Sequence, residues 1–138
     1  MLVFEFPNMR RIRYIAMMTT AYDALAEIGK AYAHPTRLRI LNILSHGEAC
    51  VCHLAAILDQ RQAHVSQHLR VLKDAKLVID RRDGLMVYYR LADVRAAATV
   101  SLLKDLYRLV QPGAVFPEAP RSPVPGCPCP KCTREDTS

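Results

Sequence analysis

Five cysteines in two clusters are the residues of this 138-residue chain whose types and spacing most clearly predict chemistry. Cys50 and Cys52 form a doublet, and Cys127, Cys129 and Cys132 lie in a proline-rich run near the C-terminus. Thiolates are soft ligands that prefer thiophilic ions and disfavour Mg²⁺ and Ca²⁺. Three thiols in one extended run can converge on a single soft ion. Both clusters are therefore candidate metal sites.

The doublet needs an irregular backbone to act as a pair. Residues two apart on a regular helix point about 200° away from each other, so Cys50 and Cys52 cannot hold one ion on an undistorted helix. They require a frayed first turn or ligands from another segment. A helix N-terminus would lower their thiol pKa values and favour the thiolate. The alternative is that each is a small buried core residue. His53 beside them is a possible nitrogen ligand, although we expect it to be a solvated side chain.

The C-terminal cysteines can reach the doublet along the chain. Residues 111–126 separate them from the folded part, and at about 3.1 Å per residue this segment spans roughly 50 Å. The tail thiols therefore either join Cys50 and Cys52 or form a second site alone, and we favour the shared site. The alternative is a tail whose cysteines are simply solvated.

Composition favours a cytoplasmic protein with a phosphate-rich partner. Residues 1–18 do not resemble a signal peptide, and no apolar run approaches the roughly 20 residues of a membrane span. Thiols stay reduced in the cytosol, where clustered cysteines bind metals or sense redox state more often than they form structural disulfides. The net charge is +6, and the charges after Gln111 cancel, so the excess lies on the folded part and suits nucleic acid.

The chain divides into three segments. Residues 1–8 are expected to be irregular, residues 9–110 to form one packed domain, and residues 111–138 to form a flexible tail rich in proline and cysteine. Within the domain, periodicity predicts helices at about 9–33, 35–44, 49–58, 61–75 and 93–110. Residues 77–82 and 85–91 predict a β-hairpin around Asp83-Gly84. The fold is thus mainly α with a β-hairpin, in the order of a winged helix-turn-helix.

The helix predicted after the turn at Asp59-Gln60 has two distinct faces. Its apolar face consists of Val65, Leu69 and Leu72, at helical spacing. Ser66, Gln67 and Arg70 lie on the opposite face. Glutamine can pair bidentately with adenine and arginine with guanine in the major groove. The alternative is an ordinary solvated polar face.

Other arginines could contact the DNA backbone. Arg81 and Arg82 flank the predicted hairpin tip, where they suit phosphates or a minor groove. The alternative is that these charges only keep the tip hydrated. Arg37 and Arg61 each stand near a predicted helix start and could also contact phosphate.

Four motifs closely resemble the ArsR/SmtB family of ion-sensing repressors, over about residues 22–110. They are His34-Pro35-Thr36-Arg37, Cys50-Val51-Cys52-His53-Leu54, Val65-Ser66-Gln67-His68-Leu69 and Tyr88-Tyr89-Arg90-Leu91. The resemblance implies a homodimeric winged helix that leaves operator DNA when a metal or metalloid binds. It also implies that Gln62 and His64, at the start of the second helix of the motif, lie near the bases.

The sequence departs from the family pattern in two places. Asp59, Gln60 and Arg61 replace the usual glycine, apolar residue and hydroxyl cap, although Asp59 tolerates a left-handed conformation and could cap the next helix. A second family site on the last helix is expected to be absent. Of its ligands only Asp93 remains, and the other positions hold Arg95, Leu106 and Leu109.

The sequence thus predicts a repressor that a thiophilic ion releases from double-stranded operator DNA. As(III) or Sb(III) is favoured over Cd(II) or Pb(II), because no cysteine precedes Cys50 to complete a four-thiolate cage. The alternative is a redox or persulfide sensor of the same fold, switched by disulfide formation. A small thiol enzyme is a remote third hypothesis, since the chain lacks an oxyanion-binding loop and a Cys-x-x-Cys motif at a helix start in a βαβ context. No membrane partner is expected.

Overall fold

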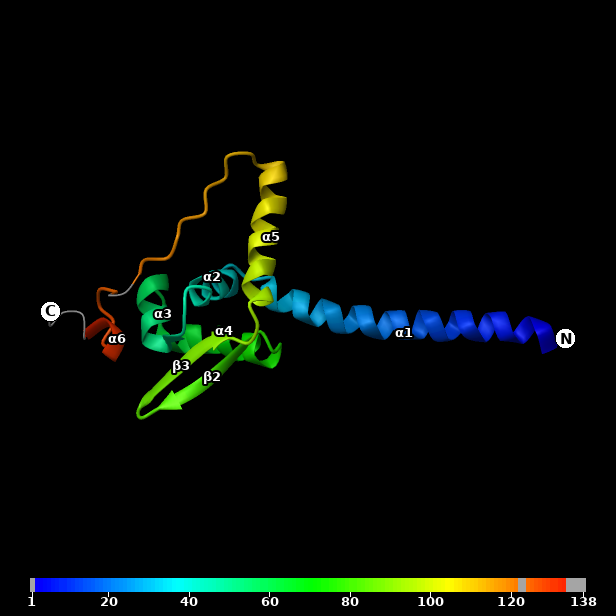
Figure 1. Ribbon diagram of the computed structural model, residues 1–138, viewed down its shortest axis with the longest axis horizontal. Helices are drawn as coiled ribbons and strands as arrows, with labels where there is room; N and C mark the ends of the chain where they lie inside the picture. The colour runs from blue at the N-terminus through cyan, green and yellow to red at the C-terminus, as the bar shows by residue number, and fades with distance from the viewer. Residues whose placement is uncertain (1, 122–123, 134–138) are drawn as a thin grey trace.

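The part of the chain that this computed structural model describes, residues 2–121 and 124–133, contains six helices and one small sheet (Figure 1). In chain order the elements are α1 (Leu2–Tyr32), α2 (Pro35–Leu44), β1 (Ala49–Cys50), α3 (Val51–Leu58), α4 (Gln62–Asp74), β2 (Val78–Asp83), β3 (Met86–Leu91), α5 (Arg95–Val110) and α6 (Pro130–Thr133). This order confirms the predicted fold, mainly α with a β-hairpin that follows a helix-turn-helix.

Helix α1 is longer than predicted and projects from the body of the molecule (Figure 1). The expectation that residues 1–8 are irregular is wrong from Leu2 onward, and residue 1 lies outside the described residues. Extending a helix costs far less than starting one, so the periodic run after Met9 can propagate backwards.

The core lies between α2, α3 and α4. Val65, Leu69 and Leu72 of α4 are fully buried, which confirms the predicted inward face of that helix. Leu41 of α2 and Leu54 of α3 are equally buried and belong to the same cluster. This packing fixes the rotation of α4, so its opposite face must be exposed.

The sheet has the strand order β1-β3-β2, and its first strand was not predicted. Ala49 and Cys50 pair antiparallel with Tyr89 and Tyr88, where the sequence had suggested the start of a helix. A two-residue strand is too short to show alternation, so only its tertiary partner reveals it. The hairpin turn is also one residue later than expected, because Asp83 pairs with Met86. Gly84 begins this turn with φ +58°, a conformation that favours glycine.

The tail follows α5 as an extended strap that leads to α6 beside α3 (Figure 1). Phe116 anchors the strap, because its ring meets Tyr107 edge-on at 6.0 Å and lies beneath the cations of Lys104 and Arg108. The last described residues of the tail are packed against α3. Flexibility of the tail stays a prediction.

Candidate metal centre and nucleic-acid interface

Cys50 and Cys52 lie where a strand becomes a helix. Cys50 is the N-cap of α3 with extended backbone (φ −80°, ψ 165°), and its Sγ accepts a hydrogen bond from the backbone N–H of His53 at 3.3 Å. Cys52 lies in the first turn of α3. The extended residue provides the irregular start that the doublet needs, so the two side chains are not forced to opposite faces of a helix.

The tail thiols reach this point through two local turns. The N–H of Cys127 donates to the carbonyl of Val124, and the carbonyl of Cys129 accepts from Cys132 and Thr133 in α6. The Sγ atoms of Cys127 and Cys52 are 3.8 Å apart. Segments separated by 75 residues therefore meet in one buried cluster.

The cluster contains two overlapping sets of potential metal ligands. One consists of Cys50, Cys52, Cys127 and Cys129, and within it every Sγ lies within 4.8 Å of the others. The second combines His53 with Cys127, Cys129 and Cys132 under the same limit. All five thiols are free of disulfides. Soft sulfur ligands in a four-membered set match the tetrahedral preference of Zn(II) and similar ions.

The distances within the cluster fit such an ion. Zinc–sulfur bonds of about 2.3 Å place two sulfurs of a tetrahedron about 3.8 Å apart. The separation of Cys127 and Cys52 is 3.8 Å, and the upper limit of 4.8 Å within each set leaves small side-chain rotations to close the rest. The cluster can therefore hold an ion without rearrangement of the backbone.

Burial changes the protonation of these thiols. Burial and a hydrogen bond with Cys52 raise the pKa of Cys50 to about 12, which outweighs the N–H of His53. Burial likewise raises the pKa of Cys127 above its usual range. Burial also opposes ionisation of Cys129, but hydrogen bonds with Cys127 and Cys132 outweigh it and lower the pKa of Cys129. The expectation that a helix N-terminus lowers the pKa of the doublet is therefore wrong for Cys50, and ion binding must displace protons.

His53 is part of the cluster and not a solvated side chain as expected. Its side chain is 8% exposed, and Nδ1 lies 3.3 Å from Sγ of Cys132. The burial of this side chain was not predicted, because its partner Cys132 lies 79 residues away in the sequence. Tyr88 closes the other side of the cluster, and the guanidinium of Arg81 lies 4.7 Å from the centre of its ring.

The residues predicted to read bases are exposed on α4. The side chains of Gln62, His64, Ser66, Gln67 and Arg70 are all exposed, whereas Val65 and Leu69 of the same helix are buried. Their orientation suits a major groove, and the contact with DNA stays a prediction.

The turn before α4 has the predicted conformation but a different capping role. Asp59 is left-handed (φ 51°, ψ 49°) and ends α3, so the expectation that it caps the next helix is wrong. Arg61 occupies the N-cap of α4 without a side-chain hydrogen bond and is exposed. An arginine at a helix start remains available to phosphate.

Two of the predicted phosphate ligands have intramolecular partners. Arg37 donates from Nε to the carbonyl of Ala31 at 2.6 Å and from a terminal nitrogen to that of Lys30 at 2.8 Å. It thereby satisfies the last carbonyls of α1. Arg81 pairs with Glu48, with Nε donating at 2.9 Å. Arg82 is exposed on β2, so among the predicted wing arginines it presents the more accessible charge.

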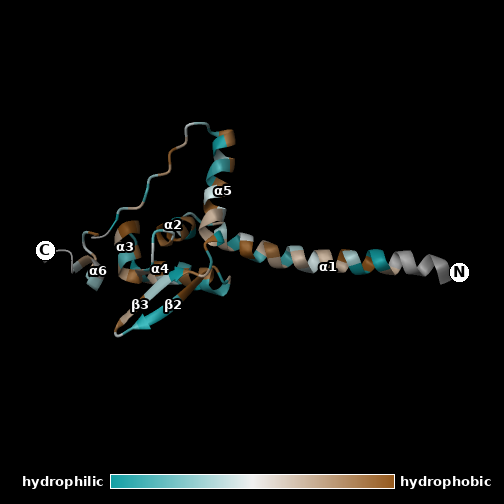
Figure 2. Cartoon of the chain, viewed as in Figure 1, coloured by the Kyte–Doolittle hydropathy of each residue, from teal (hydrophilic) through white to brown (hydrophobic). Residues whose placement is uncertain are grey.

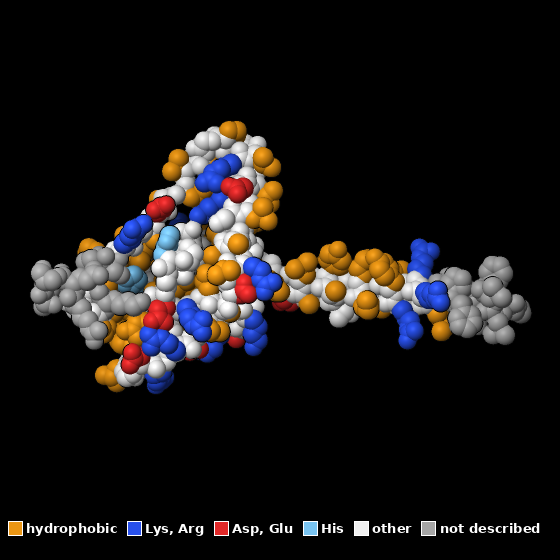
Figure 3. All heavy atoms as spheres, in the orientation of Figure 1, with side chains coloured by type: hydrophobic (Ala, Val, Ile, Leu, Met, Phe, Trp, Pro, Cys, Tyr) orange, Lys and Arg blue, Asp and Glu red, His pale blue; other side chains and the backbone are white. Residues whose placement is uncertain are grey.

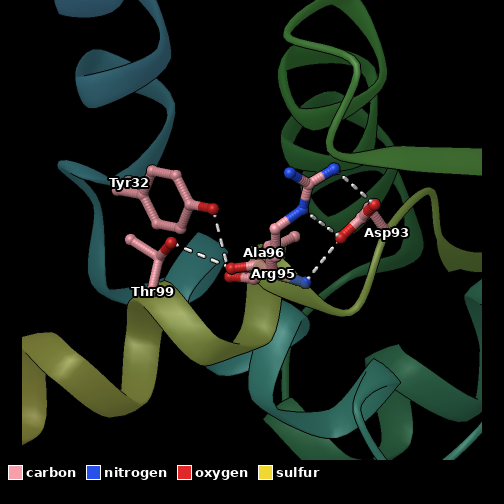
Figure 4. Close-up of polar contacts among 5 residues, drawn as sticks. All are labelled: Tyr32, Asp93, Arg95, Ala96 and Thr99. Atoms are coloured by element: carbon pink, nitrogen blue, oxygen red, sulfur yellow. Dashed lines mark hydrogen bonds and ion pairs between the residues drawn. The ribbon is translucent and has the colours of Figure 1, made fainter.

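Asp93, which matches one ligand of the family's second metal site, lies just before α5 and contacts Arg95 (Figure 4). Asp93 accepts hydrogen bonds from the backbone N–H and Nε of Arg95, both at 2.8 Å. These bonds hold the pKa of Asp93 well below its usual range. In the same view the hydroxyl of Tyr32 donates to the carbonyl of Ala96 at 3.0 Å, which ties α1 to α5.

Comparison with known proteins identifies the family. The profile described as "Bacterial regulatory protein, arsR family" matches residues 34–80. The chain is 38% identical over 86 residues to the uncharacterized HTH-type transcriptional regulator MJ1325 of Methanocaldococcus jannaschii, a match that covers 62% of this chain and 97% of that protein. This chain is an ArsR-family transcriptional regulator. The arsenical resistance operon repressor of Escherichia coli is also 38% identical over 86 residues, covering 62% of this chain and 74% of that one.

A solved structure of a possible ArsR-family regulator shares this fold. The homodimeric winged helix-turn-helix DNA-binding domain Mb0332 of Mycobacterium bovis matches with a TM-score of 0.62 and 31% identity, over 72% of this chain and 94% of that one. The profile ends at residue 80, so the tail that completes the thiol cluster lies beyond the part that defines this regulator as an ArsR-family member. The described residues include no helix that is both long and apolar enough to cross a membrane.

Proposed function

We propose that this regulator is a homodimeric repressor that binds operator DNA and leaves it when a thiophilic ion joins the doublet to the tail thiols. One observation carries the proposal. Cys127 and Cys129 of the tail meet Cys50 and Cys52 at the first turn of α3, the helix that precedes and packs on α4. An ion held there would pull the tail against the helix-turn-helix. This contact would change the position of the helix-turn-helix relative to that of the partner subunit. The reduced thiols that this requires fit a cytoplasmic protein.

Dimer formation is supported by apolar surface on α1 and α5. Figure 2 shows hydrophobic residues along α1 and α5, and Figure 3 shows apolar side chains along α1 and on the outer side of α5. These side chains include Met17, Tyr22, Leu25, Leu106 and Leu109, each at least half exposed. A patch of this size on a small domain is typical of a protein interface. The homodimeric M. bovis neighbour supports the same arrangement.

The choice of ion follows from the number of sulfurs. The sequence favoured As(III) because no cysteine precedes Cys50, but the tail supplies the missing ligands of a four-sulfur set. As(III) and Sb(III) need three of these thiolates, whereas Cd(II) and Pb(II) can use all four. The four-membered set therefore shifts our proposal towards Cd(II) or Pb(II) as inducer. The arsenical resistance repressor among the relatives keeps As(III) as the competing inducer.

Operator release during an ion titration tests the proposal. Fluorescence anisotropy of a labelled inverted-repeat duplex would be followed while the reduced protein is titrated with Cd(II), Pb(II), As(III) and Zn(II). We expect release at about one equivalent of the inducing ion per subunit. Release by an oxidant or a persulfide donor in metal-free buffer, with no response to any of the four ions, would instead support the redox alternative, which the 3.8 Å approach of Cys127 to Cys52 makes feasible.

A further inference from the structure

The six potential ligands of the cluster are more than one tetrahedral ion can use. A closed site takes four ligands, and the first set leaves out Cys132 and His53. Both residues are nonetheless buried, at 3% and 8% exposure. Their ligand atoms face each other at 3.3 Å, and the Cys132 thiol also accepts the N–H of Val124 at 3.4 Å. The structure has therefore built a second position beside the first.

The two sets share Cys127 and Cys129. Two tetrahedra with a common edge need six ligands, of which two bridge and two are terminal on each side. The cluster supplies six ligands in this arrangement. Cys50 and Cys52 are the terminal ligands on one side, His53 and Cys132 are those on the other, and the two shared thiols lie between them. We propose that the cluster is a dinuclear centre, in which Cys127 and Cys129 bridge two divalent thiophilic ions such as Cd(II) or Zn(II).

The geometry of the second position fits such an ion. Bonds of about 2.0 Å to nitrogen and about 2.3 Å to sulfur in a tetrahedron place the two ligand atoms about 3.5 Å apart. Nδ1 of His53 and Sγ of Cys132 are already 3.3 Å apart. A nitrogen and three sulfurs form one of the common ligand combinations of zinc-binding proteins.

Charge also favours a second ion in this buried place. A divalent ion with four thiolates leaves a net charge of about −2 away from water, which is costly to bury. Two divalent ions with five thiolates and a neutral imidazole leave about −1. The second ion thus reduces the buried charge while it removes the proton of Cys132. As(III) cannot form this pair, because it takes three sulfurs as terminal ligands.

The inference rests on the thiolate site proposed above, and a Cd(II) titration of the reduced full-length protein tests both. Bound ions would be counted by native mass spectrometry, and operator anisotropy would be followed in the same titration. We expect two Cd(II) per subunit in the wild type, and two cadmium resonances of equal intensity in a ¹¹³Cd NMR spectrum at saturation. Saturation at one ion with one resonance, together with operator release, would overturn the dinuclear centre and leave the proposed function standing. Failure to bind any Cd(II) would overturn both.

Variants locate the second ion. Cys132→Ser and His53→Ala should each bind one Cd(II) per subunit, while Cys129→Ser should weaken both binding steps because it removes a bridge. His46→Ala is the matched control, because this exposed histidine lies outside the cluster, and it should still bind two ions. The wild type could bind two ions while Cys132→Ser and His53→Ala bind the second ion equally well. That result would place the second ion elsewhere and overturn the proposal. The two-resonance spectrum of the wild type does not depend on how the variants fold.

Discussion

In the proposed function, different side chains bind the operator and respond to the ion. The Sγ atoms of Cys50 and Cys52 face the tail, whereas Gln67 and Arg70 project from the exposed face of α4. Substitutions in the two groups should therefore have different consequences. This independence is the property that a ligand-controlled repressor needs, because the inducer must not compete with the bases for the same atoms.

Cys50→Ser and Cys52→Ser should each bind operator with wild-type affinity but fail to release it at inducer concentrations that free the wild type. Serine preserves the size of the side chain and removes the soft ligand. Anisotropy titrations with and without Cd(II) measure both properties, and Ser45→Ala on the exposed turn after α2 serves as control. Loss of operator binding in the absence of ion would indicate that these cysteines serve only the core.

Arg70→Ala or Gln67→Ala should weaken binding to the operator by about 1–3 kcal/mol and reduce the preference for it over unrelated DNA. Arg82→Ala should weaken binding to all sequences more evenly, because a wing arginine contacts phosphate or a minor groove. Measurement at several salt concentrations separates the two effects, since a lost phosphate contact also reduces the salt dependence. Unchanged operator affinity in both α4 variants would show that another face of α4 meets the DNA.

At the scale of elements, the sequence predicted the parts whose patterns are local. The inward face of α4 and the extent of α5 follow from helical periodicity, and the structure confirms both. The strand β1, the burial of His53 and the carbonyl contacts of Arg37 were not predicted. Each depends on a partner distant in sequence or on a two-residue pattern too short to recognise. The cysteines could be singled out by type, and a shared site was favoured from the reach of the tail, but the membership of the two ligand sets depends on the path that the tail takes.

Truncation after Gln111 tests the role of the tail as an element. The truncated protein keeps α1 to α5 and should bind operator normally. It loses two of the four sulfurs of the first ligand set, so its response to ion should weaken by at least about 1.4 kcal/mol, or one decade. Chelator competition gives the affinity. The matched control for loss of the strap itself is a full-length chain in which serine replaces Cys127, Cys129 and Cys132. Unchanged ion affinity and unchanged release in the truncated protein would show that the tail takes no part.

At the scale of the whole molecule, the proposed function requires two subunits. The projecting α1 and the outer side of α5 carry apolar side chains that the described residues of one chain leave exposed (Figure 3). Burial of such surface contributes about 25 cal/mol for each Å² removed from water. A second copy that covers these faces would also set the distance between two α4 helices, which must match two operator half-sites.

The protein should therefore be a dimer at micromolar concentration in multi-angle light scattering. Leu106→Glu, on the exposed side of α5, should shift it towards monomer and reduce operator affinity, because a buried carboxylate would meet the partner. Glu118→Gln in the exposed part of the strap is a control that should stay dimeric. A wild-type monomer at this concentration would rule out the proposed assembly.

X-ray absorption of the cadmium-loaded protein tests most directly whether the doublet and the tail hold the same ion. The full-length reduced chain would be loaded with one Cd(II) per subunit, and the sulfur atoms around cadmium counted. We predict four sulfurs, from Cys50, Cys52, Cys127 and Cys129, falling to two when the chain is truncated after Gln111. Two sulfurs with oxygen or nitrogen neighbours in the full-length protein, unchanged by the truncation, would contradict the account.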